Sequence, residues 1–99
     1  MADDVDWSHG VAHMWGNHGV SVSQASEALA DPDRVLIQPD YNSRSGNSDR
    51  VIGYSHSFED LLTIILVRNE GAVYGANGWR SNDKDRALYD GSEKDGSEA

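Results

Sequence analysis

Three arginines are the strongest candidates for chemistry in this 99-residue chain. Arg50 begins one expected strand, Arg68 closes the next, and Arg80 closes the one after that. A guanidinium group is a planar fork of donors that suits phosphate or carboxylate. If the strands carrying Arg50 and Arg68 form an antiparallel pair, these two arginines lie at one end of the sheet and Arg80 at the other. Two interpretations follow: a phosphate clamp made by Arg50 and Arg68, or charges that flank strands and keep their edges soluble.

The histidines are weaker candidates. His9 and His13 are four residues apart on an expected helix, a spacing that can chelate a metal, but no acid lies nearby to complete a site. Surface or helix-terminal histidines are the alternative. His56 could act as a lone general base at a strand end, or be a solvated loop residue. The chain has no cysteine, which excludes disulfides and thiolate metal sites, and we expect no metal or cofactor.

Charge is distributed unevenly along the chain. The net charge is -9, which is unfavourable for nucleic-acid binding. Residues 1–33 hold six acids and no Lys or Arg, residues 34–80 hold five arginines and five acids, and residues 81–99 hold three cations and six acids. A local anion site is therefore compatible with the neutral middle of the chain, although long-range attraction of RNA would be weak.

One apolar run, Leu61–Val67, must lie in the core. It is rich in β-branched residues and uncharged, which predicts a strand buried on both faces. Strands are also expected at 34–38, 50–55 and 72–80, the last with glycines that could mark a bulge. Gly71 suits a tight turn between the last two strands.

Helices are expected at both ends of the chain. Trp7, Val11, Met14 and Trp15 share one face of a first helix, which we interpret as core packing. Ser21 with Gln24 forms a capping box for a second helix, whose apolar residues are Val22, Ala25, Ala28 and Leu29. We predict a last helix at residues 81–89, capped by Ser81 or Asn82.

The expected order is α-α-β-β-β-β-α, an α+β fold with a four-stranded, mainly antiparallel sheet covered by helices on one face. We expect residues 1–90 to form a single domain, with residues 1–6 frayed, and residues 91–99 to form an acidic disordered tail. No apolar run is long enough to cross a bilayer and no signal pattern opens the chain, so a soluble cytoplasmic protein is expected, without membrane partners.

Roughly residues 5–90 resemble the BrnT toxins of bacterial type II toxin–antitoxin systems. The resemblance rests on the order and spacing of several short motifs. They are Trp7, His18-Gly19-Val20-Ser21, Glu27-Ala28-Leu29-Ala30-Asp31, Arg50-Val51-Ile52-Gly53-Tyr54-Ser55, Leu61–Val67 and Arg86-Ala87-Leu88-Tyr89.

The resemblance implies a RelE-like fold and a metal-independent ribonuclease that cleaves RNA and inhibits translation. It also implies a cognate antitoxin, through which alone the complex would contact DNA. Arg50, Arg68 and Arg80 match cations of the family and are the expected catalytic residues. Trp79 departs from the family's usual Ala-Arg pattern; it could stack on a base or pack, and we assign it with His56 to RNA binding. The alternative is a non-catalytic protein-binding module of the same fold, whose acidic surface meets a basic partner.

Overall fold

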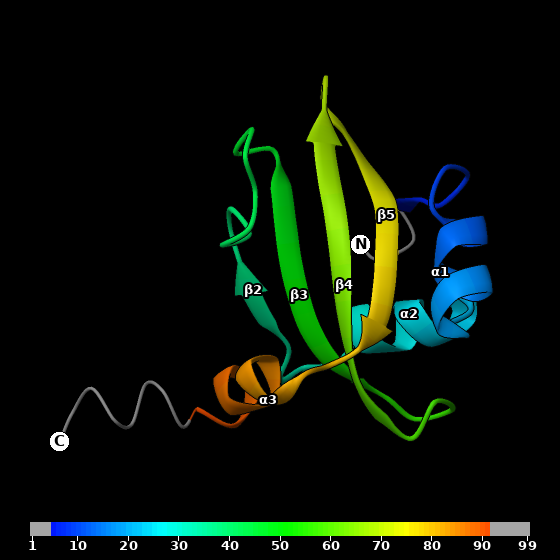
Figure 1. The fold of residues 1–99 in the computed structure, drawn as a ribbon, viewed down its shortest axis with the longest axis vertical. Helices are drawn as coiled ribbons and strands as arrows, with labels where there is room; N and C mark the ends of the chain where they lie inside the picture. Colours follow the sequence, from blue (N-terminus) through cyan, green and yellow to red (C-terminus); the bar gives the residue numbers. More distant parts are fainter. Residues whose placement is uncertain (1–4, 92–99) are drawn as a thin grey trace, which may run out of the picture.

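The computed structural model describes residues 5–91 as a sheet with three helices (Figure 1). The elements run in the following order. They are β1 (Val5–Asp6), α1 (Val11–His18), α2 (Val22–Leu29), β2 (Val35–Ile37), β3 (Ser48–Ser55), β4 (Asp60–Asn69), β5 (Ala72–Arg80) and α3 (Asp83–Asp90). The α+β class is thus as expected. Residues 92–99 of the expected tail lie outside the described residues, and Gly91 caps α3 with a φ of 80°.

The sheet has five strands, where four were expected, in the order β1-β5-β4-β3-β2. Neighbouring strands from β5 to β2 are antiparallel, but β1 runs parallel to β5, with Val5 opposite Val73. Residues 1–6 were expected to be frayed, but Val5 and Asp6 form β1, and residues 1–4 lie outside the described residues. A two-residue strand has no periodicity that a sequence can reveal. The bulge expected in β5 is present: Ile65 faces Asn77 and Leu66 faces Gly75, so Ala76 has no opposite residue.

The helices cover both faces of the sheet, which corrects the expectation that they share one face. Gly53 and Leu62 are opposite each other on the face against α2, since the Ala28 carbonyl lies directly over Gly53. Arg50 and Thr63 point to the other face, since strand residues alternate between faces, and both contact Asp85 of α3. Only one end of that second face lies under α3 (Figure 1), and Ile65, Val67 and Trp79 on it are half-buried.

The main core lies between the sheet and the two N-terminal helices. Val20, Ala25, Ala28, Leu62 and Ile64 are fully buried there. The capping box forms as predicted: the Ser21 hydroxyl accepts from the Gln24 N–H at 3.1 Å, and the Gln24 side chain accepts from the Ser21 N–H at 3.0 Å. The central strand β4 is longer than the apolar run, and its buried part includes Leu61–Ile64.

The prediction that Trp7, Val11, Met14 and Trp15 pack into the core as one face of the first helix is only partly correct. The helix begins at Val11, so Trp7 precedes it and packs its ring against Gly75 of β5. Met14 is fully buried, but Trp15 is 62% exposed and Val11 39% exposed. α1 packs mainly on β5, near the edge of the sheet, so it buries a narrower stripe than a helix over the sheet centre.

Candidate functional site

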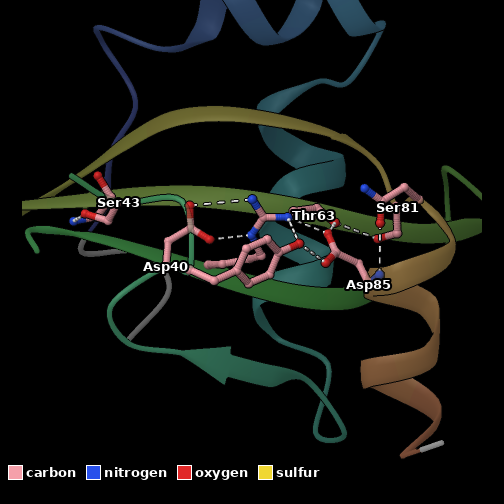
Figure 2. Close-up of polar contacts among 9 residues, drawn as sticks. Asp40, Ser43, Thr63, Ser81 and Asp85 are labelled. Atoms are coloured by element: carbon pink, nitrogen blue, oxygen red, sulfur yellow. Dashed lines mark hydrogen bonds and ion pairs between the residues drawn. The ribbon is translucent and has the colours of Figure 1, made fainter. Parts of the chain in front are cut away.

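Arg50 lies at the centre of a buried ionic network on the α3 side of the sheet. Figure 2 labels Asp40, Thr63, Ser81 and Asp85 of this network. The Arg50 side chain is 3% exposed. The Nε donates to Oδ1 of Asp40 at 2.6 Å, and Nη1 donates to Oδ2 of Asp85 at 2.7 Å. Asp40 is 6% exposed and Asp85 is 0% exposed. One guanidinium therefore compensates two buried carboxylates.

Hydroxyl groups donate further hydrogen bonds to the Asp85 carboxylate. Tyr41 donates to its Oδ1 at 2.6 Å, and Thr63 donates to its Oδ2 at 2.7 Å. The Thr63 and Ser81 hydroxyls are 2.8 Å apart. Within residues 5–91, every buried side-chain nitrogen or oxygen has a hydrogen-bond partner. The network joins the 38–47 loop, β3, β4 and the start of α3 (Figure 2), so its first effect is to fix these elements together.

Local hydrogen bonds and strand alternation position Asp85, Asp40 and Arg50 within their own segments of the chain. Asn82 caps α3 by accepting from the Asp85 N–H at 2.9 Å, which begins the helix at Asp83 and places Asp85 in its first turn. Asp40 follows β2, and its N–H donates to the Ser48 carbonyl at 2.7 Å, which folds the loop back over β3. Alternation along β3 then points Arg50 at both carboxylates.

Aromatic rings surround the guanidinium. The Arg50 Cζ lies 4.2 Å from the centre of the Tyr41 ring and 5.7 Å from that of Trp79. The Lys84 Nζ also lies 4.2 Å from the Tyr41 ring centre. Burial and the hydrogen bond to Asp85 raise the pKa of Tyr41 to about 12. Burial works to lower the pKa of Arg50, but Asp40 and Asp85 raise it overall, so Arg50 stays charged.

Arg68 does not join Arg50, contrary to the expected pair. Both lie toward the same end of the sheet, but Arg68 points to the opposite face, where it binds Asp49. Its Nε donates to Asp49 Oδ2 at 2.7 Å and its Nη2 to Asp49 Oδ1 at 2.8 Å. The hydrogen bonds from Arg68 lower the pKa of Asp49. The register explains the separation: Arg50 faces Ile65, and Arg68 is three residues further along β4, an odd step that reverses the face.

Arg80 lies at the other end of the sheet, as expected, and its side chain is 69% exposed. Its Nε lies 2.6 Å from Oδ2 of Asp60, and Nη1 of Arg86 lies 2.9 Å from Oδ1 of the same carboxylate. Two guanidinium groups thus share one carboxylate. The hydrogen bond from Arg86 is the main reason that the pKa of Asp60 falls to about 2.

Acid is expected to weaken the fold through Asp60. Its folded pKa lies below the usual value of 3.8, so the stabilisation is present above pH 4 and is lost as the pH falls toward 2. The loss is on the order of 1–2 kcal/mol, because Asp60 is partly exposed. Urea unfolding between pH 7 and pH 2 measures it, with Asp60→Asn as the comparison. Equal pH dependence in wild type and Asp60→Asn would contradict this assignment.

Of the remaining predicted residues, Trp79 lies near Arg50 and His56 does not. His56 is exposed in the turn after β3 and lies edge-on to Tyr54, with ring centres 5.3 Å apart. Trp79 lies opposite Thr63, beside Arg50, so it is the one predicted RNA-binding residue in contact with the network. His9 precedes α1, so it does not share a helix face with His13.

Sequence reasoning missed Asp40, Tyr41 and Asp85. From the sequence, Asp85 was interpreted only as an acid in the first helical turn, where its charge suits the helix dipole. Asp40 and Tyr41 lie in a polar loop without a motif. Asp40 is 10 residues from Arg50 along the chain and Asp85 is 35 residues from it, so no local pattern connects either carboxylate with the arginine.

Within residues 5–91, no group of three or more His, Asp or Glu side chains could hold a metal ion. None of the described helices is both long enough and apolar enough to cross a membrane.

Comparison of the sequence with models of known protein families finds no match, and comparison with functionally characterised proteins finds none either. The fold and the site therefore define the chain as an α+β protein with a five-stranded mixed sheet and a buried arginine–carboxylate network.

Proposed function

We propose that this chain is the toxin-fold component of a BrnT-type toxin–antitoxin pair and that it acts by binding a basic partner protein, the cognate antitoxin. Two features support the proposal. The order α-α-β-β-β-β-α expected from the sequence runs from α1 to α3, with β1 as an addition, and it is compatible with the RelE-like α+β fold that the resemblance implies. The chain also carries a net charge of -9, which favours a cationic partner.

The observation that carries this proposal is the state of the three candidate arginines. Arg50 is shared by two carboxylates, Arg68 is bound by Asp49, and Arg80 is bound by Asp60. They occupy two faces and both ends of the sheet, so they cannot hold one phosphate together. A clamp for a phosphodiester transition state needs converging donors that are not already neutralised. Binding a partner protein does not require converging donors of this kind.

Co-expression tests this proposal. A small ribbon-helix-helix protein encoded beside this gene is expected to co-elute with the chain as a stoichiometric complex, measured by size-exclusion chromatography with light scattering. The complex should weaken as salt is raised, because charge complementarity contributes to it. A purified chain that degrades RNA and binds no product of a neighbouring gene would contradict the proposal.

Metal-independent RNA cleavage is the second candidate, and one feature favours it. The open part of the sheet face presents Trp79 next to the Arg50–Tyr41 stack. Arg80, the last residue of β5, points to the opposite face at the end of the strand, and 69% of its side chain is exposed. An RNA base could stack on Trp79. Arg80 could release Asp60, which would stay paired with Arg86, and could then bind a phosphate group. The 2′-hydroxyl of the RNA would be the nucleophile.

The double variant Trp79→Ala/Arg80→Ala is expected to reduce RNA cleavage and growth arrest at least tenfold, since base stacking alone contributes about 1–3 kcal/mol. Cleavage of a labelled RNA by purified protein measures the effect. Arg44→Ala, which removes an exposed loop cation, serves as the control and should leave the rate unchanged. Full activity in the double variant would remove this site.

A further inference from the structure

A groove of about 470 Å³ lies where the end of α2, the end of β3 and α3 meet. Its aromatic lining consists of Tyr54, His56 and Tyr89, and its carboxylates are Glu27, Asp31 and Asp33. No Lys or Arg lines it. The network around Arg50 does not use any of these six side chains.

Asp31 holds the walls of the groove together. Its Oδ2 accepts from the Tyr89 hydroxyl at 2.6 Å and from the Tyr54 N–H at 2.8 Å. Its Oδ1 accepts from the Asp33 N–H at 2.9 Å. One carboxylate thus connects α3, β3 and the segment after α2. The groove is formed before any ligand arrives, which lowers the cost of ordering on binding.

The groove is negative as well as rigid. Burial works to raise the pKa of Asp31, but its hydrogen bonds lower it overall, so Asp31 is ionised at neutral pH. The hydrogen bond to Asp31 and the nearby carboxylates raise the pKa of Tyr89 to about 12. Arg34 is the adjacent cation, and its guanidinium donates to the Asp31 carbonyl at 3.1 Å.

Two carboxylates on the rim have capacity for a ligand. Glu27 accepts three hydrogen bonds, from the Ser55 hydroxyl and from the N–H and hydroxyl of Ser57, all on Oε1. Among the described residues, no hydrogen bond reaches its Oε2 or the Asp33 carboxylate. Tyr54 is 37% exposed, and its ring lies 5.3 Å from the His56 ring, centre to centre, so the two rings form one aromatic wall of the groove.

We propose that this groove binds an arginine or lysine side chain from a basic segment of the partner protein, an inference that rests on the proposed function. Exposed aromatic rings attract cations through their faces, and the rim carboxylates pair with the same charge. Arginine suits the groove better than lysine, because its planar group can stack on Tyr54 while it donates to a carboxylate.

Peptide binding tests the assignment directly. The probe is a fluorescein-labelled Gly-Arg-Gly-Arg-Gly-Arg peptide, with a citrulline version of the same shape but no charge as its pair. Fluorescence anisotropy at low salt is expected to show at least tenfold tighter binding of the arginine peptide. Asp33→Asn and Tyr54→Leu should each weaken it by about three- to fivefold, whereas Tyr54→Phe, which keeps the ring, should not.

Glu70→Gln is the matched control. It also removes one negative charge, but it lies in the β4–β5 turn, at the far end of the sheet from the β3–β4 turn that carries His56 (Figure 1). Equal weakening by Glu70→Gln and Asp33→Asn would mean diffuse attraction to an acidic protein and would overturn the groove. Thermal melting of each variant confirms that the fold is intact.

The two proposals fail separately. A partner complex that forms normally with Asp33→Asn/Tyr54→Leu overturns the groove and leaves the proposed function in place. If no partner complex forms with the wild type, the proposed function fails, and the peptide measurements alone then decide whether the groove binds arginine.

Discussion

Replacing Arg50 by alanine is expected to lower the free energy of unfolding by about 3–5 kcal/mol, the range for removing one partner of a buried ion pair. Asp40 and Asp85, which are 6% and 0% exposed, would remain without a counter-charge. Since small domains have about 5–15 kcal/mol in total, much of the stability would be lost. Urea unfolding followed by tryptophan fluorescence at pH 7 measures this.

Two further variants distinguish the loss of the buried ion pair from the effect of removing any arginine. Arg50→Lys keeps the charge but loses the planar fork, so its loss should be smaller than that of Arg50→Ala. Arg44→Ala, at an exposed position, should stay within about 0.5 kcal/mol of the wild type. A loss below about 1 kcal/mol for Arg50→Ala would show that water reaches the two carboxylates easily, against the burial described above.

This expectation also decides how RNA cleavage is tested. Loss of activity in Arg50→Ala would report unfolding, because the residue holds the 38–47 loop and α3 to the sheet. The half-buried Trp79 and the exposed Arg80 form no hydrogen bond or ion pair with Asp40 or Asp85, so their variants avoid that confusion and are used in the cleavage experiment.

The second large effect is expected for Gly53→Ala, with a loss of roughly 3 kcal/mol. A Cβ at Gly53 would overlap the backbone carbonyl of Ala28, and a backbone group cannot move aside as a flexible side chain can. The end of α2 would have to lift from the sheet, exposing Ala28 and Leu29. Urea and thermal unfolding measure the loss.

Gly16→Ala is the control for the same change of residue. Nothing lies within 4 Å of a Cβ placed at Gly16, which is inside α1. Alanine there should raise the free energy of unfolding by about 0.5–1 kcal/mol, because it favours helix over glycine. If Gly53→Ala were as stable as the wild type, α2 would not be packed tightly on β3.

Local chemistry made much of the fold predictable. Ser21 and Gln24 specify the start of α2 because both hydrogen bonds lie within one turn. Asn82 caps α3 for the same reason. Gly71, with a φ of 82°, permits the tight turn that pairs β4 with β5. Each of these signals lies within a few residues of its effect, so the sequence by itself determines it.

Tertiary structure decided what depends on residues far apart in the chain. The parallel pairing of β1 with β5 joins Val5 to Val73, which lies far along the chain. The division of helices between two faces follows from where α3 returns to the sheet, which no local pattern specifies. The exposure of Trp15 follows from the narrow contact of α1 with the sheet edge.

The arginines show the same division. The sequence determined which strands carry Arg50, Arg68 and Arg80, but β3 begins at Ser48, two residues before the expected start at Arg50. Only the sheet register put Arg50 and Arg68 on opposite faces, because side chains alternate with every residue. Only the return of α3 brought Asp85 to Arg50 across 35 residues. A buried guanidinium needs compensating carboxylates, and those could come only from distant segments that the fold brings together.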